Sequence, residues 1–424
     1  MKKKVAVMAA GLLMTLSLAG CSKTGTSTYS LIVSNPSDGL SSLERNRKRS
    51  LVLSNTIWKD FYDEELPASY EYYPFRDGSE EIASAWHYTS LLSLYNKLLK
   101  LYPNDEGIKN KHDILFDGLE YYRENRSDYR VYAVNRGFKK RGVVPGINTN
   151  VYDDNEWIAR EFLNAYEETK NEDYLTACKE TVAYTLTGWD TSINSATGKE
   201  WGGLYWGPYY TSKHTCSNAP LVGILTRLYE ETKDDSYLTW AKKIYAFSYD
   251  NFRNADGCYG DLVGTTRDVD GNTIAQATLD TTEYTYNTGT MITGAAELFR
   301  ITKEEHYLAE AKDAAEASWK VFANSTVKDG FYQMPFSSTL YFNMVLYEGY
   351  YSLLKVDSTA IKYFDGIQKS LDFCYNNYLY EGYLPVGWIQ GWIYGLDADS
   401  YHDIRDVDAN AETYAMLSIV DSMR

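Results

Sequence analysis

The stretch Tyr166-Glu-Glu-Thr-Lys-Asn-Glu-Asp-Tyr-Leu175 occurs three times in this chain with small changes. Tyr229-Glu-Glu-Thr-Lys-Asp-Asp-Ser-Tyr-Leu238 and Phe299-Arg-Ile-Thr-Lys-Glu-Glu-His-Tyr-Leu308 repeat it, so the period is about 63 to 70 residues. Each copy places a polar turn between two segments with helical periodicity. This pattern is typical of two antiparallel helices joined by a short loop.

Extending the period along the chain predicts twelve helices. They lie near residues 43–63, 81–102, 106–124, 153–169, 172–187, 217–232, 235–252, 285–302, 305–322, 339–355, 358–378 and 408–422. Six such hairpins could stack into an open solenoid or close into a ring. An open solenoid exposes two ends that need polar capping repeats, whereas a closed ring needs none. We therefore predict an all-α fold, an (α/α)6 barrel.

Long connections precede the second, fourth, sixth, eighth and twelfth predicted helices, which we expect to be inner helices. In a ring these connections gather on one face, where binding surfaces usually lie. They contain many Tyr and Trp residues, and the whole chain has 40 Tyr and 10 Trp. The aromatic side chains of Tyr and Trp suit stacking on sugars, although Tyr can equally fill the outer layers of helix packing.

The first residues predict export. Lys2 to Lys4 precede the apolar segment 5–18, which is too short to span a bilayer comfortably. The sequence Leu18-Ala19-Gly20-Cys21 resembles a bacterial lipobox, so we expect residues 1–20 to be a signal peptide and Cys21 to be lipidated; an ordinary cleaved signal is the alternative. Residues 21–42, rich in Ser, Thr and Gly, predict a flexible tether, and 43–424 the folded domain.

The charge and the cysteines exclude several classes of function. The formal net charge is −16, and removing residues 1–20 with their three lysines leaves about −19. So acidic a chain is a poor nucleic-acid binder, and a neutral substrate fits better. Four cysteines remain after Cys21 without a CxxC pair, and the five histidines show no metal-ligand spacing. We expect neither disulfide, metal nor cofactor, and contact with a membrane only through a lipid anchor at Cys21.

Two adjacent carboxylates stand out in Tyr152-Asp153-Asp154-Asn155-Glu156-Trp157, directly after a long connection. One interpretation is a helix cap, because Asp153 with Glu156 three residues later resembles a capping box. Only one of the two aspartates can serve as the cap, however. The other interpretation is a glycosidase pair, with one carboxylate as nucleophile and the other as acid and then base.

The run from Tyr152 to Trp157 resembles the paired-aspartate signature of glycoside hydrolase family 76, the endo-α-1,6-mannanases. Further segments resemble the same family: Trp189-Asp190, Trp201-Gly-Gly-Leu-Tyr-Trp206, Lys213 with Ser217-Asn218-Ala219, and Thr285-Tyr-Asn-Thr-Gly289. The resemblance covers about residues 43–424. It implies an (α/α)6 barrel and retaining hydrolysis of α-1,6-mannosidic bonds, with Asp153 as nucleophile and Asp154 as general acid/base.

Other residues are candidates for substrate binding. Trp201, Tyr205 and Trp206 lie among glycines and could stack on a sugar, or pack on the rim of the barrel. Asn218 and Asn287, near the starts of inner helices, could bind sugar hydroxyls or cap those helices. Tyr286 is a candidate subsite wall on the same grounds.

Two acidic stretches are weaker candidates for a cation site. The stretch from Asp268 to Asn272 predicts a turn, because its glycine is not at the position that a calcium loop needs. The aspartates 397, 399, 403, 406 and 408 could hold a cation, but such clusters are more often solvated.

The sequence thus predicts a bacterial lipoprotein at the cell surface or facing the periplasm, acting as an endo-α-1,6-mannanase on neutral α-mannan. Two alternatives remain: a non-catalytic glycan-binding lipoprotein, and a hydrolase of another α-linked glycan on the same fold.

Overall fold

The computed structural model describes residues 31–74, 82–126, 129–134, 138–139, 142–143, 150–323, 332–337, 339–385 and 402–424. These residues contain twelve α-helices: α1 (Ser42–Phe61), α2 (Ala85–Leu101), α3 (Glu106–Gly118), α4 (Tyr152–Thr169), α5 (Glu172–Leu186), α6 (Ala219–Thr232), α7 (Asp235–Phe252), α8 (Thr285–Thr302), α9 (Glu305–Phe322), α10 (Leu340–Leu354), α11 (Phe364–Tyr378) and α13 (Ile404–Asp421). The predicted helices are confirmed, but α3 ends at Gly118, before strand β2 (Arg123–Arg126), and α11 begins at Phe364, after a 3-10 helix (Ser358–Tyr363). The second begins at Ala85, because Ser84 caps it, and the last already begins at Ile404.

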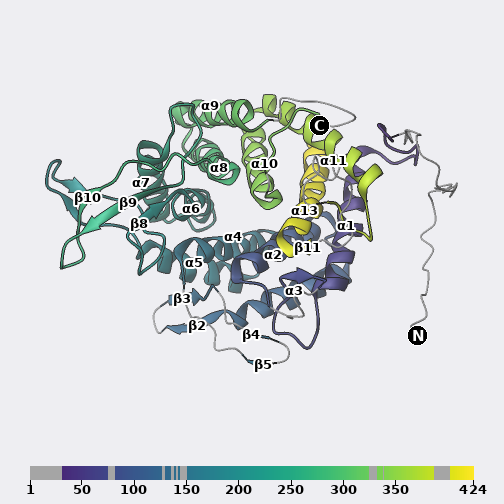
Figure 1. The fold of residues 1–424 in the computed structure, drawn as a ribbon, viewed down its shortest axis with the longest axis horizontal. Coiled ribbons are helices and arrows are strands. Elements are labelled where there is room, and N and C mark those ends of the chain that lie inside the picture. The colour runs from purple at the N-terminus through teal and green to yellow at the C-terminus, as the bar shows by residue number, and fades with distance from the viewer. Residues whose placement is uncertain are drawn as a thin grey trace, which may run out of the picture. The chain divides into compact units, whose positions relative to one another are not determined.

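The helices form a closed double ring. The helices α2, α4, α6, α8 and α10 each contact the next one, and α13 contacts both α10 and α2 (Figure 1). Around this inner ring, α3, α5, α7 and α9 each pack against the inner helix that precedes them in the chain, and α1 packs against α13. The predicted all-α (α/α)6 barrel is therefore confirmed.

The sequence repeat encodes the turns between hairpin helices. In each copy the lysine after the helix adopts a left-handed conformation, with φ between 55° and 61°, and its N–H closes the last turn. The threonine before it donates to the carbonyl four residues earlier and accepts from the backbone N–H two residues later. The residues concerned are Thr169, Lys170, Thr232, Lys233, Thr302 and Lys303. Repetition of this motif explains why the sequence predicts the hairpins well.

Short strands occur in the connections. They are β1 (Tyr72–Tyr73), β2 (Arg123–Arg126), β3 (Tyr129–Tyr132), β4 (Phe138–Lys139), β5 (Gly142–Val143), β6 (Ile193–Asn194), β7 (Lys199–Glu200), β8 (Ser212–His214), β9 (Leu262–Arg267), β10 (Thr273–Gln276) and β11 (His402–Asp403). Strands β8, β9 and β10 form one antiparallel sheet, which joins the connections before α6 and α8. Strand β1 pairs with β11 and joins the connections before α2 and α13. These pairings hold the long connections together at the end where the inner helices begin.

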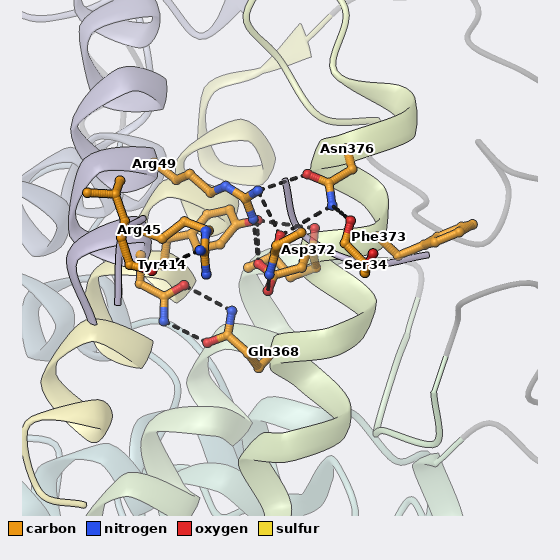
Figure 2. A network of polar contacts seen from close by, with 12 residues as sticks. Ser34, Arg45, Arg49, Gln368, Asp372, Phe373, Asn376 and Tyr414 are labelled. Atoms are coloured by element: carbon orange, nitrogen blue, oxygen red, sulfur yellow. Dashed lines mark hydrogen bonds and ion pairs between the residues drawn. The ribbon is translucent and has the colours of Figure 1, made fainter. Parts of the chain in front are cut away.

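A buried arginine ties the first helix to the last ones. Arg49 of α1 forms an ion pair with Asp372 of α11 (Nη1–Oδ1, 2.6 Å) and donates to the Tyr414 hydroxyl of α13 (3.1 Å) (Figure 2). The same guanidinium donates to Asn376 and to Asn35, which precedes α1. Since a buried charge is costly unless it is paired and hydrogen-bonded, this network favours one register for ring closure.

The N-terminal boundary of the packed chain lies earlier than expected. The backbone N–H and carbonyl of Ile32 bond to the Asn377 side chain of α11 (2.8 and 2.9 Å), and Asn35 donates to Asp372. Residues 32–41, assigned to the tether in the sequence analysis, thus already contact the barrel. Cys21 and the predicted signal lie outside the described residues. Among the residues described, no helix is both long and apolar enough to cross a membrane.

The lumen of the inner ring is lined by charged residues away from the helix starts. Lys97 of α2 forms ion pairs with Glu348 of α10 and Glu412 of α13. Arg160 of α4 pairs with Glu348 as well (2.8 Å) and with its neighbour Glu161 (2.6 Å). Four inner helices are therefore linked across the barrel axis by paired charges rather than by apolar packing alone.

Two glycines bring α8 and α10 into backbone contact. A Cβ at Gly289 would lie 2.6 Å from Leu346 Cα, and one at Gly349 would lie 2.6 Å from the Gly289 carbonyl oxygen. Any larger side chain at either position must push the helices apart.

We predict that Gly289→Ala destabilises the protein by about 1–3 kcal/mol, because the added methyl meets backbone that cannot rotate away. Urea unfolding followed by circular dichroism measures the change. Gly264→Ala is the control, since a Cβ there has its nearest neighbour at 3.8 Å. Equal stability of the Gly289→Ala protein and wild type would contradict the close packing of α8 on α10.

Candidate active site

The first turn of α4 positions the two aspartates. The helix begins at Tyr152, whose N–H donates to the Trp206 carbonyl oxygen (2.8 Å), and its N-cap is Val151, which has no capping side chain. Asp153 and Asp154 are thus the second and third helical residues. The interpretation of Asp153 as the N-cap was wrong, because the N-cap is Val151, two residues earlier, and the Tyr152 N–H bonds to the Trp206 carbonyl oxygen. Both carboxylates remain available for other roles.

Asp153 is held by donors from a different segment. Its Oδ2 accepts from Trp206 Nε1 (3.0 Å) and from Cys216 Sγ (3.3 Å), and its Oδ1 accepts from the N–H of Asp154 (2.9 Å). Burial raises the pKa of Asp153 to about 6, and the donors oppose this rise because they stabilise the ionised form. The carboxylate is therefore fixed in orientation and titrates close to neutral pH.

The environment of Asp154 favours the protonated form more strongly than that of Asp153 does. Its side chain is buried at the wall of the cavity, and burial raises its pKa well above the ordinary value. The negative charge of Asp153 raises that pKa further. Acid–base catalysis requires two neighbouring groups with different pKa values, so that one is protonated while the other is ionised. At neutral pH the pair can hold one proton on Asp154 and one negative charge on Asp153.

The pair opens into a cavity of about 430 Å³ at the end of the barrel where the inner helices begin. Most of its walls come from the first turns of inner helices and the residues just before them. The lining residues are Trp86, Asp153, Asp154, Trp157, Trp206, His214, Cys216, Asp261, Tyr284, Tyr286, Tyr341, Phe342 and Val345. The structure brings four sequence-predicted residues together here: Asp153, Asp154, Trp206 and Tyr286.

One wall of the cavity is a group of aromatic rings. The Phe342 ring lies 4.2 Å from that of Tyr286 and 5.9 Å from that of Trp86, measured between ring centroids. Trp157 and Tyr341 meet edge to face at 6.2 Å. Rings with apolar faces and polar tips match the alternating CH and OH groups of a sugar.

Trp206 is supported from behind by a neutral histidine. The His214 ring stacks on the Trp206 ring at 5.0 Å, and its Nε2 lies 2.8 Å from the Ser212 hydroxyl. Burial lowers the pKa of His214 to about 4, so the imidazole is uncharged at neutral pH. A neutral ring can stack on Trp206 without placing a positive charge beside Asp153.

A buried ion pair holds the connection that carries Trp206. Lys213 Nζ lies 2.7 Å from Asp190 Oδ2 and donates to the Gly202 carbonyl oxygen (2.6 Å), with both side chains almost fully buried. Hydrogen bonds from Lys213 and Ser192 outweigh desolvation and lower the pKa of Asp190. The family-like residues Asp190 and Lys213 therefore fix the loop and do not line the cavity.

The other four predicted binding residues lie away from this cavity. Asn218 is fully buried and bonds to the backbone of Leu204 and His214, and Asn287 donates to the Gly260 carbonyl oxygen. Both amides contact loop backbone, and Asn287 Oδ1 has no hydrogen-bond partner among the described residues; that these two asparagines bind sugar stays a prediction. Trp201 does not line the cavity either. Tyr205 lines a second, smaller cavity.

Sequence reasoning missed most of the lining residues. Trp86, Tyr341 and Phe342 lie in the first turns of α2 and α10, and Cys216 lies just before α6. One signal could have found them: in a closed ring, the first turn of every inner helix faces the same space.

The acidic stretches show no cation site among the described residues. Asp268 accepts from the N–H groups of Asp270 and Asn272, which confirms the turn. Asp403 caps α13, Asp406 accepts from the N–H of Leu340, and Asp397 and Asp399 lie outside the described residues. One group elsewhere, Asp256, Cys258 and Glu283, has ligand atoms within 4.8 Å of one another. Burial raises the pKa of Cys258 to about 12, which disfavours the thiolate that binds metals.

Comparison with known proteins gives consistent results. The model of glycosyl hydrolase family 76 matches residues 66–372. A mannan endo-1,6-alpha-mannosidase of Candida albicans is 29% identical over 177 residues, which is 40% of this chain and 36% of that protein. The chain thus aligns with about a third of the length of this relative.

Two solved structures share the fold. A family 76 mannosidase from Bacteroides thetaiotaomicron superposes with a TM-score of 0.76 at 22% identity, over 89% of this chain and 99% of that chain. An inactive variant of an α-1,6-mannanase from Salegentibacter sp., in complex with α-1,6-mannotetrose, superposes with a TM-score of 0.67 at 20% identity, over 88% and 99%.

The burial of Asp153 predicts a specific dependence of stability on pH. Its folded-state pKa of about 6 exceeds the ordinary 3.8, so its contribution to stability is complete below about pH 4 and is lost as the pH rises through 6. Asp153→Asn cannot ionise, and we expect it to be more stable than wild type at pH 7 by about 1–3 kcal/mol and equally stable at pH 4. Urea unfolding at both pH values measures this.

The exposed Asp250→Asn on α7 is the matched control, with stability expected to stay within about 0.5 kcal/mol of wild type at both pH values. A loss of stability in Asp153→Asn at pH 7 would show that ionised Asp153 is compensated by its donors.

Proposed function

Because the chain belongs to glycosyl hydrolase family 76, we propose that it is a retaining endo-α-1,6-mannanase, with Asp153 as nucleophile and Asp154 as general acid/base. The observation that carries this proposal is the pair of adjacent carboxylates, half-buried Asp153 and buried Asp154, at the wall of an aromatic-lined cavity. The substrate is a neutral α-mannan, and the reaction needs neither metal nor cofactor.

The named relatives support the substrate class. The Candida albicans relative is a mannan endo-1,6-alpha-mannosidase, and the Salegentibacter enzyme is an α-1,6-mannanase bound to α-1,6-mannotetrose. That variant is inactive with two consecutive aspartates replaced by alanine. We propose that Asp153 and Asp154 form an adjacent pair with the same importance for activity.

The proposed reaction has two steps. Ionised Asp153 attacks the anomeric carbon while Asp154 gives its proton to the departing glycosidic oxygen, which leaves a mannosyl ester on Asp153. Asp154, now ionised, takes a proton from water, and the resulting hydroxide equivalent breaks the ester with a second inversion. The hydrogen bonds from Trp206 and Cys216 keep the Asp153 carboxylate oriented. The aromatic wall excludes water around the developing charge.

We also propose that the protein is an exported lipoprotein anchored through Cys21. The support comes from the basic and apolar segments of residues 1–20 and the lipobox-like sequence before Cys21. An anchor at that position would lie eleven residues before Ile32, the first described residue with a hydrogen bond to the barrel.

The catalytic roles predict a large loss of activity on single substitution. Asp153→Asn and Asp154→Asn should each lower kcat/KM on debranched α-1,6-mannan about 10³-fold or more, because each removes a group that bonds to the reacting atoms. Reducing-end release measures the rate, and proton NMR identifies the first anomer, which retention requires to be α. Asp250→Asn is the control. Full activity in either variant, or a β-anomer released first, would contradict the mechanism.

The hydrogen bond from Trp206 predicts a shift in the pH profile. Activity should rise as Asp153 ionises near pH 6 and fall as Asp154 loses its proton at higher pH. Trp206→Phe removes a donor that favours the ionised form, so the rising limb of kcat/KM should move up by about one pH unit.

Trp201→Phe is the matched control for this shift. The Trp201 indole N–H has no hydrogen-bond partner among the described residues, and Trp201 does not line the cavity. A rising limb at the same pH in wild type and Trp206→Phe would contradict the role of this bond.

A further inference from the structure

Three residues on one side of α4 lead from the active site into the lumen of the barrel. Asp154, Trp157 and Arg160 are spaced three apart, so they lie in successive turns of the helix. Asp154 lines the active-site cavity, whereas Arg160 lines a cavity of about 320 Å³ that is walled by residues of all six inner helices, the lumen cavity. Trp157 lines both cavities, and its side chain therefore lies between them.

The Arg160 guanidinium contacts two aromatic residues of the active-site wall. Its central carbon lies over the Trp157 ring, 4.4 Å from the ring centroid, and its Nη2 lies 3.4 Å from the Tyr341 hydroxyl. Both rings line the active-site cavity, but Arg160 itself does not, so the contacts come from the lumen side. A cation is attracted to the electron-rich face of an indole, and more strongly where water is excluded.

The guanidinium is itself held in place by carboxylates. Its Nη1 donates to Glu348 of α10 (2.8 Å), and its Nε donates to Glu161 of α4 (2.6 Å). A planar guanidinium can bond to carboxylates through its edge while its face covers a ring, which the ammonium group of a lysine cannot do. The contact with Trp157 is therefore fixed by partners on two inner helices.

The lumen cavity leaves the Trp157 ring less restrained by packing on that side. Empty space beside a side chain supplies no van der Waals contacts, so it does not oppose movement of the ring. Arg160 lies on this side and contacts the ring. Loss of the guanidinium should thus allow Trp157 to move toward the lumen and away from the active-site cavity.

We propose that Arg160 is a positioning residue for substrate binding, which holds the rings of Trp157 and Tyr341 in the active-site wall from the lumen side. The inference rests on the proposed function, because it assigns these two rings to the binding of mannan. Arg160 does not touch the sugar in this proposal. The ion pairs around Arg160 then shape the substrate-binding cavity as well as linking inner helices.

The test is Arg160→Met, which removes the cation and its hydrogen-bond donors but keeps an apolar side chain. We expect KM for a linear α-1,6-mannooligosaccharide to rise about tenfold and kcat to change less than about twofold, because the rings bind substrate and transition state alike. Reducing-end release measures both constants. If Arg160 served folding alone, kcat would fall with the fraction of folded enzyme and KM would stay the same.

Arg227→Met is the matched control. Arg227 lines the same lumen cavity and pairs with a carboxylate, that of Glu167 (2.8 Å), but it does not line the active-site cavity. Arg160→Lys keeps the charge without the planar guanidinium, and its KM should rise about threefold; it decides the question if Arg160→Met does not fold. An unchanged KM in the Arg160 variants that fold would overturn the proposal, as would an equal rise in Arg227→Met.

A measurement without substrate separates this inference from the proposed function. In protein labelled with 5-fluorotryptophan, the fluorine resonance of Trp157 is identified by its loss in Trp157→Phe. It should shift and broaden in Arg160→Met, because the ring is no longer held, and remain unchanged in Arg227→Met. A resonance in Arg160→Met as narrow as in wild type would show that the ring is held without Arg160. If wild type cuts no α-1,6-mannooligosaccharide, the proposed function fails, and the resonance still reports on the ring.

Discussion

Closure of the inner ring is the constraint on which the rest of this structure depends. Because each hairpin reverses the chain, all six inner helices run in the same direction and begin at the same end. Their first turns therefore meet around one space, and their positive dipole ends point into it. Asp153 owes its position to this geometry, and so do the rings of Trp86 and Phe342. The network around Arg49, which ties α1 to α11 and α13, belongs to the same closure.

Buried carboxylates have different surroundings at the active-site end of the barrel and in its lumen. In the lumen, Lys97 and Arg160 pair with Glu348, and these two cations lower its pKa in spite of burial. In the first turns of α4, burial raises the pKa of Asp153, Asp154 and Glu156, and both oxygens of Glu156 have no hydrogen-bond partner in the described part of the chain. A buried carboxylate without a hydrogen-bond partner, such as that of Glu156, lowers stability, and proteins tolerate such groups mainly near functional sites.

The sequence predicts the helices well because the turn motif around Lys170 is local and is repeated. It singles out Asp153 and Asp154 by their place after a long connection, whereas their catalytic roles come from the family resemblance and stay a proposal. It does not reveal the contacts of Asn218, since an amide that binds a sugar and one that binds a loop look the same in sequence, and only the fold brings Leu204 to this side chain. Cys216 was missed for the related reason that its contact with Asp153 crosses 63 residues of chain.

The bonds between Ile32 and Asn377 join residues 345 apart in the sequence. Contacts between residues so far apart in the sequence form slowly, because the chain loses the conformational entropy of the intervening loop before the contact can stabilise it. The first helix can pack on α11 and α13 only after these two helices have been synthesised. Until then the apolar face of α1 stays open to chaperones, proteases and other nascent chains. The topology that gathers the active site therefore delays the packing of α1 until α11 and α13 are present.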